Sequence, residues 1–119
     1  SVIQLAGVSA LKNAKKETEA MKTEYNRRRQ YMIKRLRDMG LGITVEPTGA
    51  FYVFANAKHI SMDSYALALD IVEKAHVGVT PGIDFGPNGE GYLRFSYANS
   101  LENIAEGMDR LERYLNSLA

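Results

Sequence analysis

Apolar residues at spacings of three and four run through residues 10–39 and predict one helix of about thirty residues. The apolar stripe consists of Leu11, Ala14, Thr18, Met21, Tyr25, Met32, Leu36 and Met39. Basic residues crowd its last turns, where cations suit the helix dipole, and Gly40 stands at the stop position. A helix this long cannot bury its whole stripe against one small sheet. Its first half therefore needs another surface, which first suggests that the chain is a piece of something larger.

The length and the missing cysteines narrow the protein class. The 119 residues predict one domain, which is large enough to fold without disulfides or a structural metal. The absence of cysteine excludes disulfide scaffolds, zinc ribbons, iron–sulfur sites and thiol nucleophiles. No apolar run approaches the ~20 residues of a membrane helix, and the start does not resemble a secretory signal. We therefore expect a cytoplasmic protein that makes no contact with a membrane.

Charge is unevenly spread along the chain. Residues 12–37 hold ten basic and three acidic residues, whereas the rest holds five basic and eleven acidic residues; +7 and −6 sum to the net +1. A basic segment can bind nucleic acid or an anionic membrane surface. The commoner explanation is a solvated helix face, which we favour because three acids interrupt the run and no aromatic stacking platform surrounds it.

After Gly40 the apolar pattern changes to period two and predicts short strands. We expect strands at 43–46, 51–55, 77–80 and 91–98, and a helix at 61–75. A last helix begins after Asn99 or Ser100, with Glu102 completing a capping box and a buried stripe of Ile104, Met108, Leu111, Tyr114 (or Leu115) and Leu118. The order α-β-β-α-β-β-α predicts an α+β two-layer sandwich, with helices on one face of a small mixed or antiparallel sheet.

Few residues carry a recognisable chemistry. His59 and His76 stand alone, without a carboxylate at the spacing of a triad or a metal site. The acidic residues of the last helix lie mostly away from its apolar stripe and are best explained by solvation. The glycine-rich stretch after Pro81 lacks the Lys-Ser/Thr of a phosphate loop. We therefore expect no metal site and no nucleophilic triad.

Arg94 is the strongest candidate for a binding residue. Strand alternation places it on the face opposite Leu93, Phe95 and Tyr97, in an aromatic-rich strand. A partly desolvated guanidinium binds carboxylate or phosphate through two parallel hydrogen bonds. An exposed strand arginine or an internal salt bridge is the more frequent explanation of such a residue when it is considered alone.

The turn Pro47-Thr48-Gly49-Ala50-Phe51-Tyr52 is a second candidate. Its glycine allows close backbone approach, and the aromatic pair Phe51 and Tyr52 could form the wall of a pocket. An ordinary turn that leads into a core strand is again the commoner explanation for this pattern.

Several motifs together resemble the class I/II aminotransferases, the pyridoxal-phosphate enzymes of the aspartate aminotransferase type and fold type I. The resemblance rests on Val77-x-Val79-x-Pro81-Gly82-x-x-Phe85-Gly86, on Gly91-Tyr92-Leu93-Arg94-Phe95-Ser96-Tyr97-Ala98 and on the turn at 47–52. The basic stretch Tyr25-Asn26-Arg27-Arg28-Arg29 also resembles a segment of the family's long interdomain helix. The resemblance covers nearly the whole chain, in order.

The resemblance implies roles for individual residues. Arg94 would bind the α-carboxylate of the substrate, and Phe51 and Tyr52 would lie near that substrate. Residues 1–40 would form a helix bridging from a large cofactor domain, and residues 41–119 the small C-terminal domain. Closure of the small domain would exclude water from the site.

The resemblance also implies parts that this chain does not contain. The family's Schiff-base lysine and cofactor contacts lie upstream, and we expect none of the lysines here to replace that lysine. We therefore expect pyridoxal phosphate, an amino-acid or keto-acid substrate, the large domain and a second subunit in the intact enzyme. This chain alone is expected to bind no cofactor and to be inactive, with no catalytic residue of its own.

Two other hypotheses for the function fit parts of the sequence. A free-standing RNA-binding α/β sandwich would use the aromatic strand and the basic helix, although its element order differs. An amino-acid-sensing domain of ferredoxin-like shape has the right size but leaves the long first helix unexplained.

Overall fold

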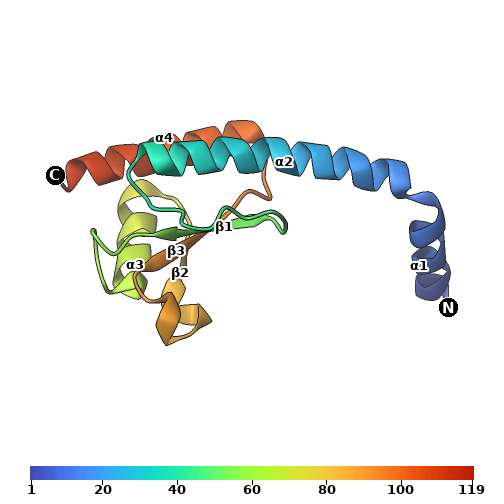
Figure 1. Ribbon diagram of the computed structural model, residues 1–119, viewed down its shortest axis with the longest axis horizontal. Helices are drawn as coiled ribbons and strands as arrows, with labels where there is room; N and C mark the ends of the chain where they lie inside the picture. Colours follow the sequence, from blue (N-terminus) through green and yellow to red (C-terminus); the bar gives the residue numbers. More distant parts are fainter.

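The computed structural model describes residues 1–119 and extends over 53 × 29 × 27 Å. A long helix runs along one side of a small sheet, and a second helix lies beside it (Figure 1). In chain order the elements are α1 (Val2–Asn13), α2 (Lys15–Asp38), β1 (Tyr52–Asn56), α3 (Ser64–Ala75), β2 (Thr80–Pro81), the 3₁₀ turns η1 (Gly82–Phe85) and η2 (Pro87–Gly89), β3 (Tyr92–Ser96) and α4 (Leu101–Ser117).

The prediction of one helix over residues 10–39 was wrong in extent and continuity. The chain forms two helices that meet at Ala14, whose backbone leaves the helical region at φ −96°, ψ 20°. The first helix starts at Val2 because Ser1 and Gln4 form a capping box, a signal that the sequence does carry. Figure 1 shows α1 turning away from the end of α2.

The first half of this helical region lacks a packing partner within the chain, as the sequence predicted. No residue of α1 is buried, and Leu11 is 91% exposed. In α2 full burial begins at Met32, Ile33 and Leu36, and Tyr25 before them is partly buried against the core. No helix of the chain combines the length and apolar character needed to span a membrane.

The sheet has three antiparallel strands in the order β1-β3-β2, where four strands were predicted. The run at 43–46 forms no strand, since its neighbourhood contributes a single bridge between Gly42 and Asn56. Val45 is 82% exposed, so only one of the two apolar residues in that run has a core to face. The strand expected at 77–80 is reduced to Thr80–Pro81. The element order is therefore α-α-β-α-β-β-α.

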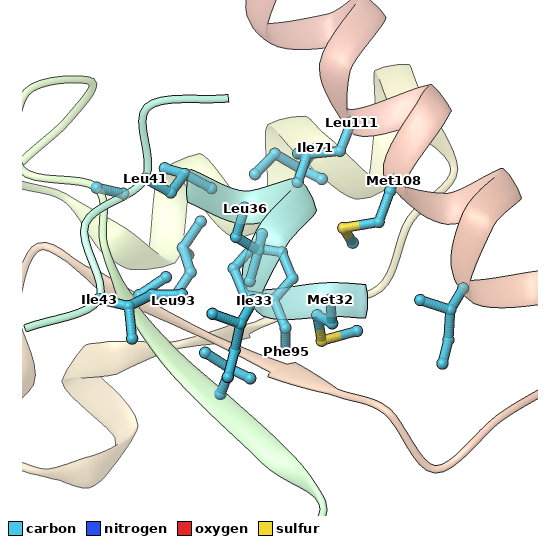
Figure 2. Packing of buried hydrophobic residues seen from close by; sticks show 14 of the residues in the cluster. Met32, Ile33, Leu36, Leu41, Ile43, Ile71, Leu93, Phe95, Met108 and Leu111 are labelled. Atoms are coloured by element: carbon cyan, nitrogen blue, oxygen red, sulfur yellow. The ribbon is translucent and has the colours of Figure 1, made fainter. Parts of the chain in front are cut away.

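The helices cover one face of the sheet and enclose the core with it. Figure 2 shows Leu36 of α2, Leu111 of α4 and Ile71 of α3 converging above Leu93 and Phe95 of β3. All five are nearly or fully buried. The α+β class with helices on one face of a small antiparallel sheet is thereby confirmed.

The last helix follows its predicted pattern except at its ends. Ile104, Met108, Leu111 and Tyr114 are buried, whereas Leu118 is half-exposed because the helix ends before it. The Ser100 hydroxyl caps the helix by accepting from Asn103 N at 3.1 Å, and the Glu102 capping box does not form. The helix starts one residue later than a cap at Asn99 would require.

The basic residues of α2 are largely paired with carboxylates of this same chain. Arg35 Nη2 lies 2.7 Å from Asp109 and 3.4 Å from Glu112, both on α4. Arg29 and Arg37 share Glu46, each at 3.1 Å. Ion pairs therefore link the basic part of α2 to acidic residues that follow it in the chain. These pairs account for part of the basic run without a nucleic-acid partner.

Candidate functional site

The central strand β3 divides its side chains between the two faces of the sheet, as the alternation predicted. Leu93 and Phe95 are buried against the helices, and Tyr97 continues that row just after the strand. Tyr92 and Arg94 are half-buried on the opposite face, which no helix covers. Arg94 thus stands in the middle of the sheet, on the face that packing leaves open.

The neighbours of Arg94 come from three other segments. Thr80 of β2 is its direct cross-strand partner, and Arg94 Nη2 donates a hydrogen bond to Thr80 Oγ1 at 3.3 Å. The guanidinium carbon lies 5.3 Å from the ring centre of Tyr52, in β1, and 4.9 Å from that of Phe85, in η1. An attraction of this kind between a cation and an aromatic ring contributes about 0.5–1 kcal/mol per contact at exposed sites. Apart from the bond to Thr80, the guanidinium donates no hydrogen bond within the chain.

Arg94 has no carboxylate partner within the chain. Apart from Arg113, every other arginine forms an ion pair: Arg27, Arg28, Arg29, Arg35, Arg37 and Arg110. The single hydrogen bond to a neutral hydroxyl leaves most of the five N–H donors of Arg94 free. An oriented, half-buried guanidinium with free donors is suited to bind an anion such as a carboxylate. The internal salt bridge that the sequence left open does not form.

Aromatic rings continue from Arg94 across the open face. Phe54, the cross-strand partner of Arg94 in β1, meets Phe85 edge to face at 5.9 Å and stacks on Tyr92 at 4.9 Å. The ammonium of Lys58 lies 5.3 Å from the Tyr92 ring centre. The open face is therefore an aromatic layer with a cation within it at Arg94 and another at Lys58.

The loop that carries Phe85 is held by very close backbone packing. A Cβ atom added to Gly82 would stand 2.0 Å from Gly89 O, and one added to Gly89 would stand 2.2 Å from Gly82 O. Only glycine allows this approach of η1 to η2. Phe85 thereby has a fixed place beside Arg94.

A carboxylate ties the same loop to the start of α3. Glu90 Oε1 accepts from the backbone N–H groups of Ser64 and Gly91, both at 2.8 Å, and the buried Ser64 hydroxyl accepts from Ile83 N at 3.1 Å. Hydrogen bonds from Ser64 and from the Gly91 backbone hold the pKa of Glu90 below its usual range. The position of Phe85 thus depends on residues of α3 as well as on the two glycines.

The structure brings the three residues singled out from the sequence into one cluster. Tyr52 contacts the Arg94 guanidinium, and the Phe51 ring meets the Tyr52 ring edge to face at 5.4 Å. Thr80 and Phe85 belong to the same cluster and were not predicted as site residues. Phe85 stands in the motif at residues 77–86, but its contact with Arg94 depends on the fold of η1, and the contact of Thr80 depends on strand pairing.

No lysine of the chain has the surroundings that a cofactor-binding lysine needs. Such a lysine is activated by desolvation or by a neighbouring cation in an enclosed site, and all the lysines here are exposed. The resemblance implies that the family's Schiff-base lysine stands in an S-x-x-K-like motif; Ser9 and Lys12 have this spacing, but both are exposed on α1. No group of three or more His, Asp or Glu side chains is arranged to hold a metal ion.

Residues 1–111 match the family described as "Aminotransferase class I and II". The chain belongs to this family. It is 48% identical to the aspartate aminotransferase of Pyrococcus horikoshii in an alignment 118 positions long, which covers 97% of this chain and 30% of that protein. It is 44% identical to the aromatic-amino-acid aminotransferase 2 of Thermococcus litoralis, over 95% of this chain. The family resemblance inferred from the motifs is thereby confirmed, and the RNA-binding and sensing alternatives have no support.

Solved aminotransferase structures share the fold. The aromatic aminotransferase of Pyrococcus horikoshii superimposes with a TM-score of 0.84 at 42% identity, over 89% of this chain and 28% of that protein. A Pyrococcus structure titled "protein-A1" gives a TM-score of 0.91 at 44% identity, over 97% of this chain. The chain spans about 30% of the length of the aminotransferases that it matches.

Proposed function

We propose that this chain is the small C-terminal domain of a pyridoxal-phosphate-dependent amino-acid aminotransferase and that Arg94 binds the α-carboxylate of its substrate. In this proposal residues 1–40 are the bridge to a large domain, and residues 41–119 are the small domain. Family membership supports the reaction class, and the geometry of Arg94 supports the role of that residue.

The observation that carries the proposal is the set of contacts around Arg94. Thr80 on one edge and the rings of Tyr52 and Phe85 orient the guanidinium without neutralising it. A carboxylate can occupy two parallel N–H donors of such a fork, and a charged hydrogen bond of this kind contributes about 1.5–3 kcal/mol. Tyr52 and its neighbour Phe51 would form one wall beside the bound carboxylate.

The residues of this chain do not by themselves form a site for the cofactor. Every lysine is exposed, and the open face offers an anion-binding arginine among aromatic rings. We propose that the family's cofactor is held by a large domain and that this chain alone neither binds it nor transaminates. Pyridoxal phosphate supplies the electron-withdrawing chemistry of such enzymes; the residues described here bind and orient the substrate.

The proposal names partners as well as a substrate. The open face and the unpacked α1 would both be covered in the intact enzyme, by the large domain and by a second subunit of a homodimer. Approach of the open face to a large domain would remove water from around Arg94 and strengthen its pairing with the carboxylate. We expect the intact enzyme to be cytoplasmic.

The test uses a chimaera in which this chain replaces the matching region, 30% of the length, of the Pyrococcus horikoshii aspartate aminotransferase. We expect the chimaera to transaminate and Arg94→Lys to lower kcat/KM for the amino acid roughly 10- to 100-fold, because an ammonium cannot form the two parallel hydrogen bonds. Arg113→Lys, at the other arginine without an ion pair, is the matched control and should leave kcat/KM unchanged.

Two results would contradict the proposal. An active chimaera with equal kcat/KM for the Arg94→Lys and Arg113→Lys variants would remove Arg94 from substrate binding. Covalent capture of pyridoxal phosphate by the 119-residue chain on borohydride reduction, abolished by substitution of one lysine, would show that this chain holds the cofactor alone.

A further inference from the structure

We infer that Arg29 is a positioning residue, which fixes the turn at 46–51 on α2 and thereby sets the place of Tyr52 beside Arg94. The inference rests on the proposed function for its effect on substrate binding. Its structural part, the attachment of the turn to the helix, stands on the contacts of Arg29 alone.

Arg29 extends from α2 to the turn with nearly every donor engaged. On its own helix, Nε and Nη2 donate to Asn26 Oδ1 at 3.1 and 2.8 Å. Across 17 and 18 residues of sequence, Nη1 donates to Glu46 Oε1 at 3.1 Å and to Pro47 O at 3.0 Å. Its side chain is only 17% exposed, in contrast to 59% for Arg27, two positions earlier. Arg29 therefore lies between α2 and the turn, whereas Arg27 extends into solvent.

The turn itself has little else to hold it. Residues 47–50 form no hydrogen bond between main-chain groups, and Ala50 has a positive φ of 63°, which costs a non-glycine residue about 1–2 kcal/mol. The Tyr97 hydroxyl donates to Ala50 O at 3.0 Å and, more weakly, to Gly49 O at 3.4 Å. Arg29 at the start of the turn and Tyr97 at its end are thus the side chains that hold its main chain, and Arg37 shares the Glu46 carboxylate with Arg29 at 3.1 Å.

Apolar packing does not substitute for these two contacts. A groove of about 610 Å³ separates α2 from the turn, with Tyr25, Asn26, Arg29, Thr48 and Gly49 among its lining residues. In Figure 1 the turn that leads into β1 lies below α2, beyond the end of the sheet. The guanidinium of Arg29 therefore links α2 to the turn at the edge of this groove through its hydrogen bonds.

The turn leads directly to the aromatic wall of the candidate site. Ala50 is followed by Phe51 and Tyr52, and Phe51 O accepts from Tyr97 N at 2.8 Å where the strand pairing begins. A turn that moves relative to α2 would displace the Tyr52 ring, whose centre is 5.3 Å from the Arg94 guanidinium. Arg29 would thus influence Arg94 without touching it, from a helix on the other side of the sheet.

The structural part is tested on the ¹⁵N-labelled 119-residue chain. Arg29→Met removes the hydrogen bonds between α2 and the turn. Arg27→Met, which removes the same charge from the same helix, is the matched control. We expect Arg29→Met to accelerate amide hydrogen exchange at Tyr97 N at least tenfold. We also expect it to shift the Arg94 Nε resonance, because the guanidinium lies near the Tyr52 and Phe85 rings and a displaced ring changes the field at that nitrogen. The Arg27→Met variant should match the unaltered chain in both measurements.

A second variant distinguishes the loss of a contact at the turn from general unfolding of the chain. Tyr97→Phe removes only the hydroxyl contact at the end of the turn and should shift the same Arg94 resonance, with circular dichroism unchanged. Should Arg29→Met lose its helical signal, Arg29→Lys, which keeps the charge but cannot engage Asn26, Glu46 and Pro47 together, replaces it in the comparison with Arg27→Met. An unshifted Arg94 resonance in Tyr97→Phe, or Arg29→Met behaviour equal to that of Arg27→Met, overturns the inference.

The functional part is tested in the chimaera described above. Arg29→Met should raise KM for the amino acid roughly threefold to tenfold and change kcat less, because Arg94 is still present but less well oriented. If Arg94→Lys lowers kcat/KM while Arg29→Met matches Arg27→Met, the positioning role fails and the proposed function stands. If Arg29→Met alters exchange while Arg94→Lys leaves kcat/KM unchanged, the proposed function fails and the attachment of the turn stands.

Discussion

The two faces of the sheet differ in what their side chains are bound to. On the covered face, Leu93 and Phe95 are buried in the hydrophobic core, against which α2, α3 and α4 pack (Figure 2). On the open face, Arg94 and Tyr92 are half-buried beneath aromatic rings and the η1 loop. The covered face supplies stability, and the open face keeps a charged group oriented but without an ion pair. This difference is what favours a binding role for the open face.

We expect substitutions at adjacent residues of β3 to differ greatly in how much they lower the free energy of unfolding. Leu93→Ala should lower the free energy of unfolding by about 2–5 kcal/mol, because it leaves a cavity in a closely packed core. Tyr92→Ala should cost about 1 kcal/mol, since it removes mainly the stacking on Phe54. Urea unfolding of both variants measures the two values. Equal losses would mean that the open face contributes to the core as much as the covered face does.

A smaller effect is expected where the open face depends on close backbone approach. Gly89→Ala should lower the free energy of unfolding by about 1–3 kcal/mol, because the added methyl meets the Gly82 carbonyl and neither backbone can yield. Gly107→Ala in α4 is the control, since nothing lies within 4 Å of its added methyl and alanine favours the helix by about 0.5–1 kcal/mol. Thermal unfolding separates the variants, and a stable Gly89→Ala protein would contradict a fixed place for Phe85.

The smallest effect concerns the pH dependence of folding stability that Glu90, which holds the loop beside the open face, contributes. Because the folded-state pKa of Glu90 is lowered, its stabilisation is present above its unfolded pKa and is lost as the pH falls through the folded pKa. Glu90→Gln should therefore reduce stability at neutral pH and flatten the decline below about pH 4–5. Glu73→Gln, at an exposed helix position outside any ion pair, serves as the control. Unfolding measured from pH 7 to pH 3 would show parallel curves if Glu90 had no such role.

Much of this architecture could be predicted from the sequence where a pattern repeats. The strand around Arg94 alternates over several residues, so its face assignment was correct, and the last helix shows its buried stripe clearly. The run at 43–46 offered only two alternating apolar residues, which were too few to specify a strand. The break at Ala14 has no local signal, because alanine favours helices and neither glycine nor proline stands there.

The candidate site was predictable only in its central residue and its first aromatic wall. Arg94 and Tyr52 stand in recognisable motifs, but Thr80 becomes a neighbour through antiparallel register and Phe85 through the fold of η1. Arg29 lies in a basic run whose members are indistinguishable in sequence. Its contacts with Glu46 and Pro47 follow from how the turn is placed beside α2.

The most direct test of the central claim compares a ligand that has an α-carboxylate with one that lacks it. In the chimaera, we would measure the Kd of aspartate and of isoasparagine, in which an amide replaces only the α-carboxylate, for the unaltered protein and for Arg94→Met. We predict a roughly 10- to 100-fold weaker Kd for aspartate and a much smaller change for isoasparagine, because only aspartate presents the α-carboxylate that Arg94 would bind. Equal weakening of both ligands, or of neither, would contradict the assignment of Arg94 to the substrate α-carboxylate.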